Sequence, residues 1–305
     1  MIVVGLGTQG KKRKLSAGED FVASVDPFNG LADYKSVEEV PLESFDGAFL
    51  CTPDNEKPRL INYLASNEKH ILCEKPLKFN HAEEFDCFEE LCRSKSIFYS
   101  TAYNHRFEPS FVRMKELIQM GILGQIYSIS LFYGNGTAKE VQSSPWRDQG
   151  DGVLSDLGSH LIDTLEFWLP NTNKTYQICR LNRFESNSFD YARIQSVSEF
   201  PTIALEMTTC MWKNSFECRL IAEFGSAHIL GLCKWGPASL VIRKRVFPSG
   251  VPTEEEFLFP PGDPTWNTEY ATFKDRVSKG HLTDLTLDKF IFSEITRINK
   301  EIKTS

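Results

Sequence analysis

The chain begins Met1-Ile2-Val3-Val4-Gly5-Leu6-Gly7-Thr8-Gln9-Gly10, and this stretch is the strongest indication of fold class in the sequence. Four apolar or small residues lead directly into the pattern Gly-x-Gly-x-x-Gly. Between a strand and a helix, the first glycine permits a tight turn, the second lets the backbone approach a pyrophosphate, and the third lets the helix pack on the strand. The free N–H groups at the start of the helix then face the anion. The pattern predicts a dinucleotide-binding loop made of Gly5, Gly7, Thr8, Gln9 and Gly10.

Asp26 supports this interpretation, because it lies 21 positions after Gly5, at the end of a second apolar run. A carboxylate at that place accepts hydrogen bonds from the adenosine ribose. A glycine-rich turn with an exposed aspartate is the alternative. The helix after Gly10 must be short, and its basic run at 11–14 has no apolar periodicity. Such a cation could contact the 2′-phosphate of NADP, whereas Asp26 would repel it, so the residues favour NAD, with NADP as the alternative.

Strand and helix patterns alternate through the first hundred residues. Apolar runs at 21–26, 48–52, 70–73 and 97–102 are separated by stretches with helical spacing. This alternation predicts an α/β fold that opens with a Rossmann-type parallel sheet over residues 1–102. Beyond it, two helical patterns, six consecutive strand patterns and two closing helices predict a second α/β domain at 103–305, with a large, mainly antiparallel open sheet.

Length, charge and cysteine content limit the classes of function. A chain of 305 residues fits two compact units, and its net charge of −7 disfavours binding to nucleic acid. No apolar run reaches the roughly 18–20 residues of a membrane span, and the start lacks the pattern of a signal peptide. The eight cysteines contain no CxxC pair. We therefore expect a cytoplasmic protein with reduced thiols, no metal site and no membrane contact.

Two short segments carry candidate catalytic groups. Lys75 follows the fourth apolar run, and ligands of open α/β sheets bind at the carboxyl ends of strands, where a lysine can stabilise a substrate oxygen. A surface lysine before Pro76 is the alternative. Asp156 and His160 are four residues apart, so a helix carries both on one face, and imidazole suits a general base near neutral pH. A helix cap and a buried histidine are the alternative there.

With these motifs in this order, the chain resembles the Gfo/Idh/MocA oxidoreductases over essentially its whole length. The resemblance also rests on Thr52-Pro53, Tyr103-Asn104-His105-Arg106-Phe107, Gly121-Ile122-Leu123-Gly124 and Trp146-Arg147. It implies that Lys75 is the catalytic lysine and that His160 takes the proton when an alcohol is oxidised. The cofactor-side residues that it implies are Thr52, Pro53, Glu74 and Lys75. The substrate-side residues that it implies are Arg106, Trp146, Arg147, Asp156 and His160.

The function implied by the resemblance is NAD(P)-dependent hydride transfer to or from a sugar, cyclitol or related polyhydroxy substrate. A homodimer or homotetramer formed through the C-terminal sheet is implied as well. The chain departs from the family pattern at Lys57, which stands where relatives usually carry a histidine, and in its short basic first helix. A catalytically silent nucleotide- or sugar-sensing regulator and an enzyme for an imine or a tetrapyrrole-like ligand are the alternatives.

Overall fold

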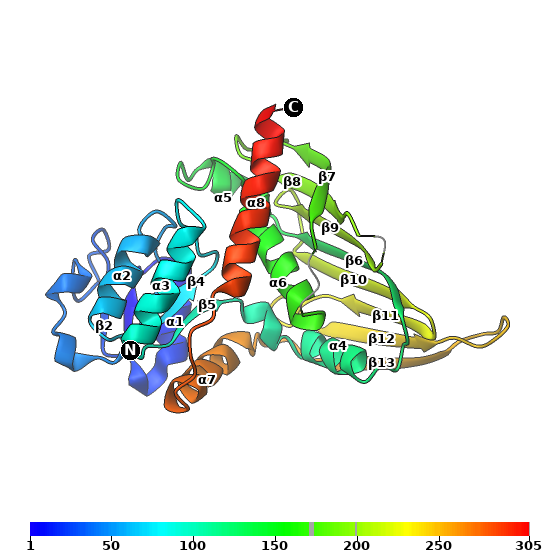
Figure 1. Cartoon of the computed structure of the whole chain (residues 1–305), viewed down its shortest axis with the longest axis horizontal. Helices are drawn as coiled ribbons and strands as arrows, with labels where there is room; N and C mark the ends of the chain where they lie inside the picture. The colour runs from blue at the N-terminus through cyan, green and yellow to red at the C-terminus, as the bar shows by residue number, and fades with distance from the viewer. Residues whose placement is uncertain (171–173, 199, 305) are drawn as a thin grey trace. The chain divides into compact units, whose positions relative to one another are not determined.

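The computed structural model describes residues 1–170, 174–198 and 200–304, which fall into two compact units (Figure 1). The first unit contains Met1–Asn104 and Thr265–Ser293, and the second contains His105–Pro264 and the residues from Glu294 onward. This division differs from the expected domains 1–102 and 103–305, because the segment Thr265–Ser293 returns to the first unit. It does so because Tyr270 and Phe273 are buried in the core of that unit.

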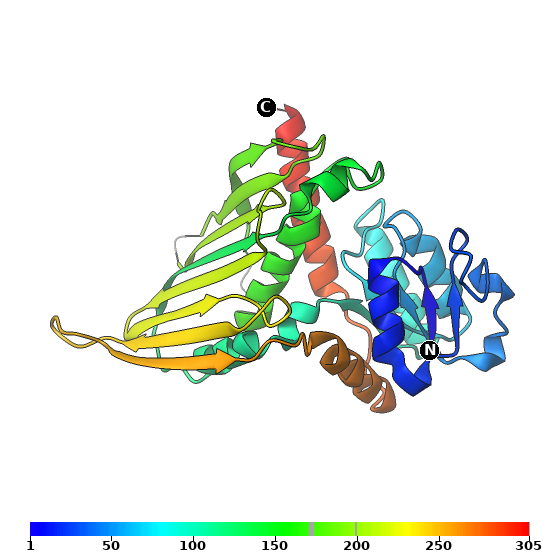
Figure 2. The same ribbon diagram turned by 180° about the vertical axis from the view of Figure 1, so that it is seen from behind.

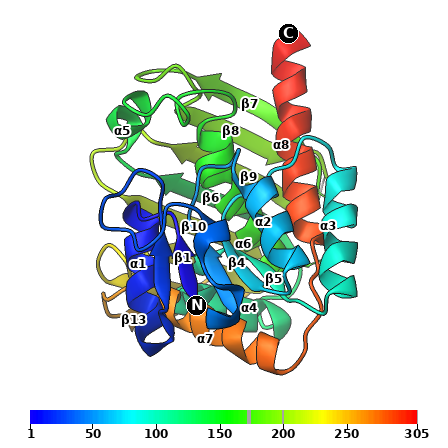
Figure 3. The same cartoon turned by 90° about the vertical axis from the view of Figure 1, so that its left-hand side faces the viewer.

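The first unit is built on a five-stranded parallel sheet with the order β2-β1-β3-β4-β5, as the alternating pattern predicts. Its strands are β1 (Ile2–Val4), β2 (Ala23–Val25), β3 (Gly47–Leu50), β4 (His70–Glu74) and β5 (Tyr99–Ala102). Its helices are α1 (Thr8–Ala17), α2 (Lys57–Ser66), α3 (Glu83–Ser94), α7 (Thr265–Ser278) and the first residues of α8 (Thr286–Thr304). Figure 3 shows α1 directly following β1.

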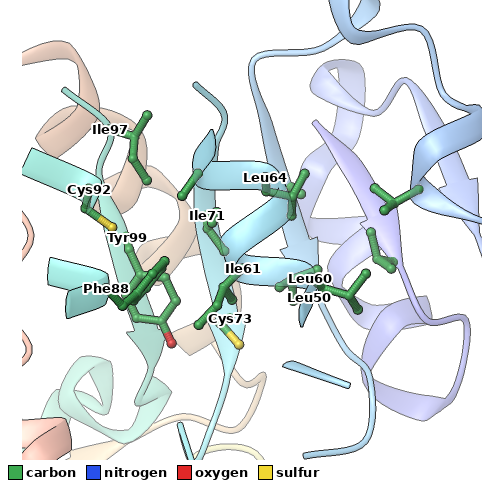
Figure 4. Packing of buried hydrophobic residues seen from close by; sticks show 14 of the residues in the cluster. Leu50, Leu60, Ile61, Leu64, Ile71, Cys73, Phe88, Cys92, Ile97 and Tyr99 are labelled. Carbon is green, nitrogen blue, oxygen red and sulfur yellow. The ribbon is translucent and has the colours of Figure 1, made fainter. Parts of the chain in front are cut away.

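Alternate residues of each strand supply the two faces of this sheet. On one face, Leu60, Ile61 and Leu64 of α2 pack with residues of α3 and with Leu50 and Ile71 of the sheet (Figure 4). The opposite face carries a second apolar cluster, formed with α1 and α7. The main members of that cluster are Val3, Ala17, Phe49, Leu72, Phe98, Tyr270 and Phe273. Both faces of the parallel sheet are therefore covered by helices, as a doubly wound fold requires.

The second unit is built on an eight-stranded sheet with the order β13-β12-β11-β10-β6-β9-β8-β7 (Figure 2). Its strands are β6 (Ile126–Gly134), β7 (Tyr176–Asn182), β8 (Tyr191–Ser196), β9 (Thr202–Thr208), β10 (Ser215–Ala222), β11 (Gly225–Leu230), β12 (Ala238–Lys244) and β13 (Thr253–Phe259). Every neighbouring pair is antiparallel except β6 with β9. The expected fold class, α/β with a parallel sheet followed by a large, mainly antiparallel sheet, is confirmed.

Helices α4 (Pro109–Gln119) and α6 (Ser159–Trp168) lie on one face of this second sheet, and α5 (Ala138–Gln142) is a short additional helix. The ring of Phe111 on α4 contacts both Trp168 of α6 and Phe216 of β10. The sequence patterns missed β13, because the run Glu254-Glu255-Glu256 hides its alternation. Charged residues of this kind are typical of an edge strand.

Among the described helices, none has the length and apolar character needed to span a bilayer. Within the same residues, no group of three His, Cys, Asp or Glu side chains is arranged to hold a metal ion. All eight cysteines are free thiols.

Candidate active site

The glycine loop has the geometry that a bound dinucleotide needs. Gly5 has a φ of +93°, and a Cβ on it would lie 2.5 Å from the Cys51 carbonyl oxygen. A Cβ on Gly10 would lie 1.8 Å from the carbonyl oxygen of Gly5, so helix and strand pack too closely for any side chain. A Cβ on Gly7 would meet nothing within 4 Å, and α1 begins at the next residue, Thr8. The loop therefore leaves open space at the N-terminus of a helix, where an anion is stabilised.

Asp26 is fixed to this loop by backbone donors. Its Oδ2 accepts the N–H of Leu6 at 2.8 Å, and its Oδ1 accepts the N–H groups of Phe28 and Asn29, each at 2.9 Å. Burial acts to raise the pKa of Asp26, and the three N–H donors outweigh it, so that the pKa lies below its ordinary value. A carboxylate oxygen has two acceptor positions, and Oδ2 uses one of them for Leu6. The ionised Asp26 thus retains acceptor capacity for a ribose hydroxyl.

Thr52 follows β3, and its hydroxyl is an unsatisfied buried group. Its Oγ1 is shielded from solvent and makes no hydrogen bond to any residue that the structure describes. Buried polar atoms without a partner are rare in native structures, so each one needs an explanation. With Pro53 next to it, Thr52 lies at the carboxyl edge of the same sheet as Gly5. The open glycine loop and this hydroxyl therefore fit a dinucleotide at the place that the motifs predict.

Lys57 holds the loop that carries Lys75. Its Nζ donates to Oδ1 of Asp54 at 2.7 Å and to the carbonyl oxygen of Pro76 at 2.9 Å. Burial disfavours the charged form of Lys57, and the Asp54 carboxylate outweighs this, so the pKa of Lys57 lies above its ordinary value. The residue that departs from the family pattern is thus a fully buried anchor. It fixes the backbone immediately after Lys75, which follows β4 and precedes a cis proline.

In the second unit, the candidate base His160 is stacked on a second histidine. The rings of His160 and His105 lie 4.0 Å apart and 17° from parallel. Nζ of Lys234 lies 3.0 Å from Nε2 of His105 and 3.1 Å from the hydroxyl of Tyr133. A lysine ammonium only donates hydrogen bonds, so a charged Lys234 requires Nε2 of His105 as the acceptor. This contact disfavours a positive charge on His105 beside His160.

Two further buried groups support this cluster. Glu108 accepts the N–H of Cys233 with its Oε2 at 3.0 Å, which fixes the backbone just before Lys234. Burial raises the pKa of Glu108. Burial also raises the pKa of Tyr133, and the nearby Asp156 carboxylate adds to the rise, so the Tyr133 phenol remains protonated. The Tyr133 ring contacts the ring of His160, so Asp156 and His160 both lie near Tyr133.

Asp156 lies in a π-helical turn at Leu154–Gly158, directly before α6. Such turns often occur at functional sites. Its Oδ2 lies 3.4 Å from Nη2 of Arg147, so the structure brings together two residues that the sequence analysis singled out separately. Trp146, the neighbour of Arg147, is exposed.

Arg106 makes an ion pair that no sequence pattern indicates. Its Nε lies 3.0 and 3.1 Å from the two carboxylate oxygens of Asp163, and its Nη2 also contacts Oδ1. Asp163 is completely buried on α6. Two donors of the Arg106 guanidinium are thus committed to a structural partner, and the expected role of Arg106 in substrate binding has no support from these contacts.

Sequence reasoning missed three residues of these clusters: Tyr133, Glu108 and Lys234. Their signal is weak, because each is a single polar residue in or beside an apolar strand or helix. His105 belongs to a quoted motif, yet nothing in its spacing indicates the stack with His160, which requires the tertiary fold.

A dinucleotide loop on a parallel sheet, followed by a mixed-sheet domain with two stacked buried histidines, is typical of the class of two-domain nucleotide-dependent oxidoreductases. Residues 2–103 match the model of the oxidoreductase family with an NAD-binding Rossmann fold, and residues 111–227 match the GFO/IDH/MocA C-terminal domain. The chain belongs to the Gfo/Idh/MocA oxidoreductase family, and its first unit is an NAD-binding Rossmann domain.

Similar proteins agree with this assignment. The trans-1,2-dihydrobenzene-1,2-diol dehydrogenase of Bos taurus is 23% identical over 262 residues, covering 82% of this chain and 74% of that protein. A levoglucosan dehydrogenase solved with NADH superposes with a TM-score of 0.82 at 17% identity, covering 98% of this chain and 96% of that one. An inositol dehydrogenase homologue from Azotobacter vinelandii, solved with NADH and myo-inositol, has a TM-score of 0.81 at 16% identity, with 100% and 95% covered. Other curated relatives match over only 30% to 57% of their own length.

Proposed function

We propose that the protein is an NAD-dependent dehydrogenase or reductase of a sugar, cyclitol or related polyhydroxy substrate. The observation that carries the proposal is that each of the two units contains a cluster of candidate functional residues. The first unit combines an open glycine loop, an ionised Asp26 and an anchored Lys75 loop. The second unit combines His160 with a stacked second histidine, His105, whose Nε2 contacts Nζ of Lys234. Relatives that act on a diol, an anhydrosugar or an inositol support the substrate class.

In the proposed reaction, bound NAD supplies a two-electron hydride acceptor. The Lys75 ammonium donates a hydrogen bond to the substrate oxygen and stabilises the negative charge that develops there. His160 accepts the hydroxyl proton when the alcohol is oxidised, and returns it when the carbonyl is reduced. Nζ of Lys234 contacts His105, and a charged Lys234 disfavours a second positive charge on that ring, so we assign the proton to His160. Asp156 is paired with Arg147, and we assign it the role of orienting a second substrate hydroxyl.

The first test of this function is nucleotide binding. We expect NAD+ or NADH at about 1 mM to raise the melting temperature, since a ligand at 100 times its dissociation constant adds about 2.7 kcal/mol to stability. Sugars and cyclitols are then screened by the change in NADH absorbance. No shift with NAD or NADP in either oxidation state, from protein shown to be free of co-purified nucleotide, would contradict the proposed function and favour a catalytically silent regulator that senses a sugar.

Asp26 provides a sharper test of cofactor choice. We expect Asp26→Asn to weaken NAD+ binding by about tenfold or more, because a hydrogen bond to a charged group contributes about 1.5–3 kcal/mol. NADP+ binding should weaken less or improve, since the repulsion of its 2′-phosphate is removed. Fluorescence titration with NADH and NADPH measures both changes. Asp33→Asn, an exposed carboxylate that accepts hydrogen bonds from Ser24, is the matched control. An unchanged ratio of NADH to NADPH affinity would contradict the role given to Asp26.

We also propose that the second sheet joins copies of this chain through the face opposite α4 and α6. Pairing across the strands places Leu258, Ser239, Leu230 and Glu217 in one row on a single face of the sheet. Leu230, Leu258 and Ile221 are exposed in the described residues. Exposed aliphatic side chains gathered on one face favour association.

Light scattering should therefore give two or four times the chain mass of 34.8 kDa. We expect Leu230→Arg to lower the mass toward that of the monomer, because it places a charge within the patch that the proposed interface would bury. Leu15→Arg, at an exposed leucine of the first unit, should leave the mass unchanged. A wild-type protein that is monomeric at all concentrations would refute this assembly.

A further inference from the structure

Arg13 is a buried cation in the helix that follows the glycine loop. The basic run at 11–14 suggests a solvated face, and its three lysines are exposed. Arg13 is only 1% exposed. Its guanidinium lies 4.3 Å from the ring centroid of Trp266 and 5.8 Å from that of Phe49. A charge in such a place requires buried partners of opposite sign.

Two carboxylates provide that compensation. Nε of Arg13 lies 2.7 Å from Oε1 of Glu74, and Nη2 lies 2.7 Å from Oε2 of Glu269. The two glutamate side chains are 14% and 5% exposed. Burial opposes the charge on Arg13, and the two carboxylates outweigh it, so the pKa of Arg13 lies above its ordinary value. The cluster therefore contains one cation and two anions in a largely dry environment, where charges act over longer distances than in water.

The topology of the sheet shows which end of the cofactor would lie near this cluster. Glu74 is the last residue of β4, and ligands of a doubly wound sheet lie beyond the carboxyl ends of the strands. The order β2-β1-β3-β4-β5 puts Asp26, after β2, on one side of β1 and puts Glu74 on the other. If Asp26 binds the adenosine ribose, the nicotinamide end extends toward β3 and β4. Glu74 and its partner Arg13 are on that side.

The nicotinamide ring changes charge during the reaction, being cationic when oxidised and neutral when reduced. A carboxylate beside it stabilises the oxidised form, and a neighbouring guanidinium offsets that preference. We propose that Arg13 sets the relative affinity of this protein for NADH over NAD+ by compensating the charge of Glu74. This inference rests on the proposed function, since it needs the nucleotide bound in the predicted orientation. Arg13 acts through Glu74 and is therefore a positioning and charge-compensating residue.

A purely structural role makes a different prediction. If Arg13 only tied α1 to β4 and α7, its loss would loosen the site and weaken both nucleotides by the same factor. Charge compensation instead changes the ratio of the two dissociation constants. The ratio thus distinguishes the two roles without any measurement of turnover.

The experiment measures dissociation constants for NAD+ and NADH at pH 8, with protein fluorescence for NAD+ and NADH emission for the reduced form. We expect Arg13→Met to raise the ratio of the NADH constant to the NAD+ constant by about tenfold, the size of effect that one unit charge has across one or two side-chain lengths in a partly buried site. Arg13→Lys should restore most of the wild-type ratio. Glu269→Gln removes one negative charge and should move the ratio in the opposite direction.

Equal weakening of both nucleotides in Arg13→Met, with no change in ratio for Glu269→Gln, would overturn the inference and leave the proposed function intact. A wild-type protein that binds neither nucleotide would overturn the proposed function itself. If Arg13→Met does not fold, the ratio in Glu269→Gln decides alone: a fall supports charge compensation, and an unchanged or higher ratio refutes it.

Discussion

Replacing Lys75 with alanine should lower kcat by about a thousandfold, within the range of about 10²–10⁴ that a positioned proton-transfer or charge-stabilising group contributes. NADH should still bind within about twofold of the wild-type affinity, because the glycine loop and Asp26 hold the nucleotide by separate contacts. The Michaelis constant should change much less than kcat, since the charge on the substrate oxygen develops mainly in the transition state. Steady-state kinetics with the substrate found in the screen, together with NADH fluorescence titration, measure these quantities.

The size of this effect follows from how the Lys75 loop is held. Lys57 anchors the Pro76 carbonyl oxygen, and Asp54 holds Lys57 in turn, so the backbone that directly follows Lys75 is held in place. Lys75→Arg keeps the charge in a different shape and should recover only part of the rate. Lys95→Ala, an exposed lysine paired with Glu68, is the control and should have wild-type rates. A kcat for Lys75→Ala within tenfold of wild type would refute the catalytic assignment.

The fold could be predicted from the sequence where the signal is local. The glycine pattern, the apolar runs and the alternation of strands with helices depend on nearest neighbours, and the parallel sheet follows from them. The return of Thr265–Ser293 to the first unit could not be predicted, because α7 has an ordinary helical pattern and nothing in it indicates which core will receive Tyr270 and Phe273. Strand β13 was missed because three consecutive glutamates mask its periodicity.

For the candidate site as well, sequence patterns predict residues that belong to local motifs, but not the contacts that the tertiary fold creates. Motif spacing predicts Asp26, Lys75 and His160 as site residues, because Asp26 and Lys75 follow strand ends and His160 lies four residues after Asp156. The partners of these residues come from distant segments: Arg13 reaches Glu74 across 61 positions, and Lys234 reaches His105 across 129. Such pairs leave no periodic trace in a single sequence. These pairs also determine the charges and pKa values around the candidate site. The sequence therefore predicts which residues are candidates more readily than it predicts their electrostatic environment.

Replacing Arg106 with alanine should destabilise the protein by about 3–5 kcal/mol, the usual cost of leaving one charge of a buried ion pair without its partner. Asp163 is completely buried, and Arg106 contacts both of its carboxylate oxygens. Urea unfolding followed by circular dichroism measures the loss. Arg113→Ala, which removes an exposed i,i+3 pair with Glu116, should cost less than about 1 kcal/mol. Arg106→Met combined with Asp163→Leu should recover much of the loss, because an apolar pair of similar volume leaves no buried charge.

The destabilisation of Arg106→Ala should also depend on pH, with a sign that identifies Asp163 as the cause. In the wild type, burial raises the pKa of Asp163 and the Arg106 guanidinium lowers it, leaving it above the ordinary value. Removing Arg106 leaves only burial, so the folded-state pKa of Asp163 rises further above its unfolded value. When the pKa of a carboxyl is higher in the folded state than in the unfolded state, the group stabilises the fold at pH values below its pKa in the unfolded state. This stabilisation is lost as the pH rises through the pKa of the folded state. The variant should therefore be closer to wild type in stability at pH 5 than at pH 8. A stability difference that is constant between these pH values would show that the lost energy comes from packing of the Arg106 side chain rather than from the unpaired charge of Asp163.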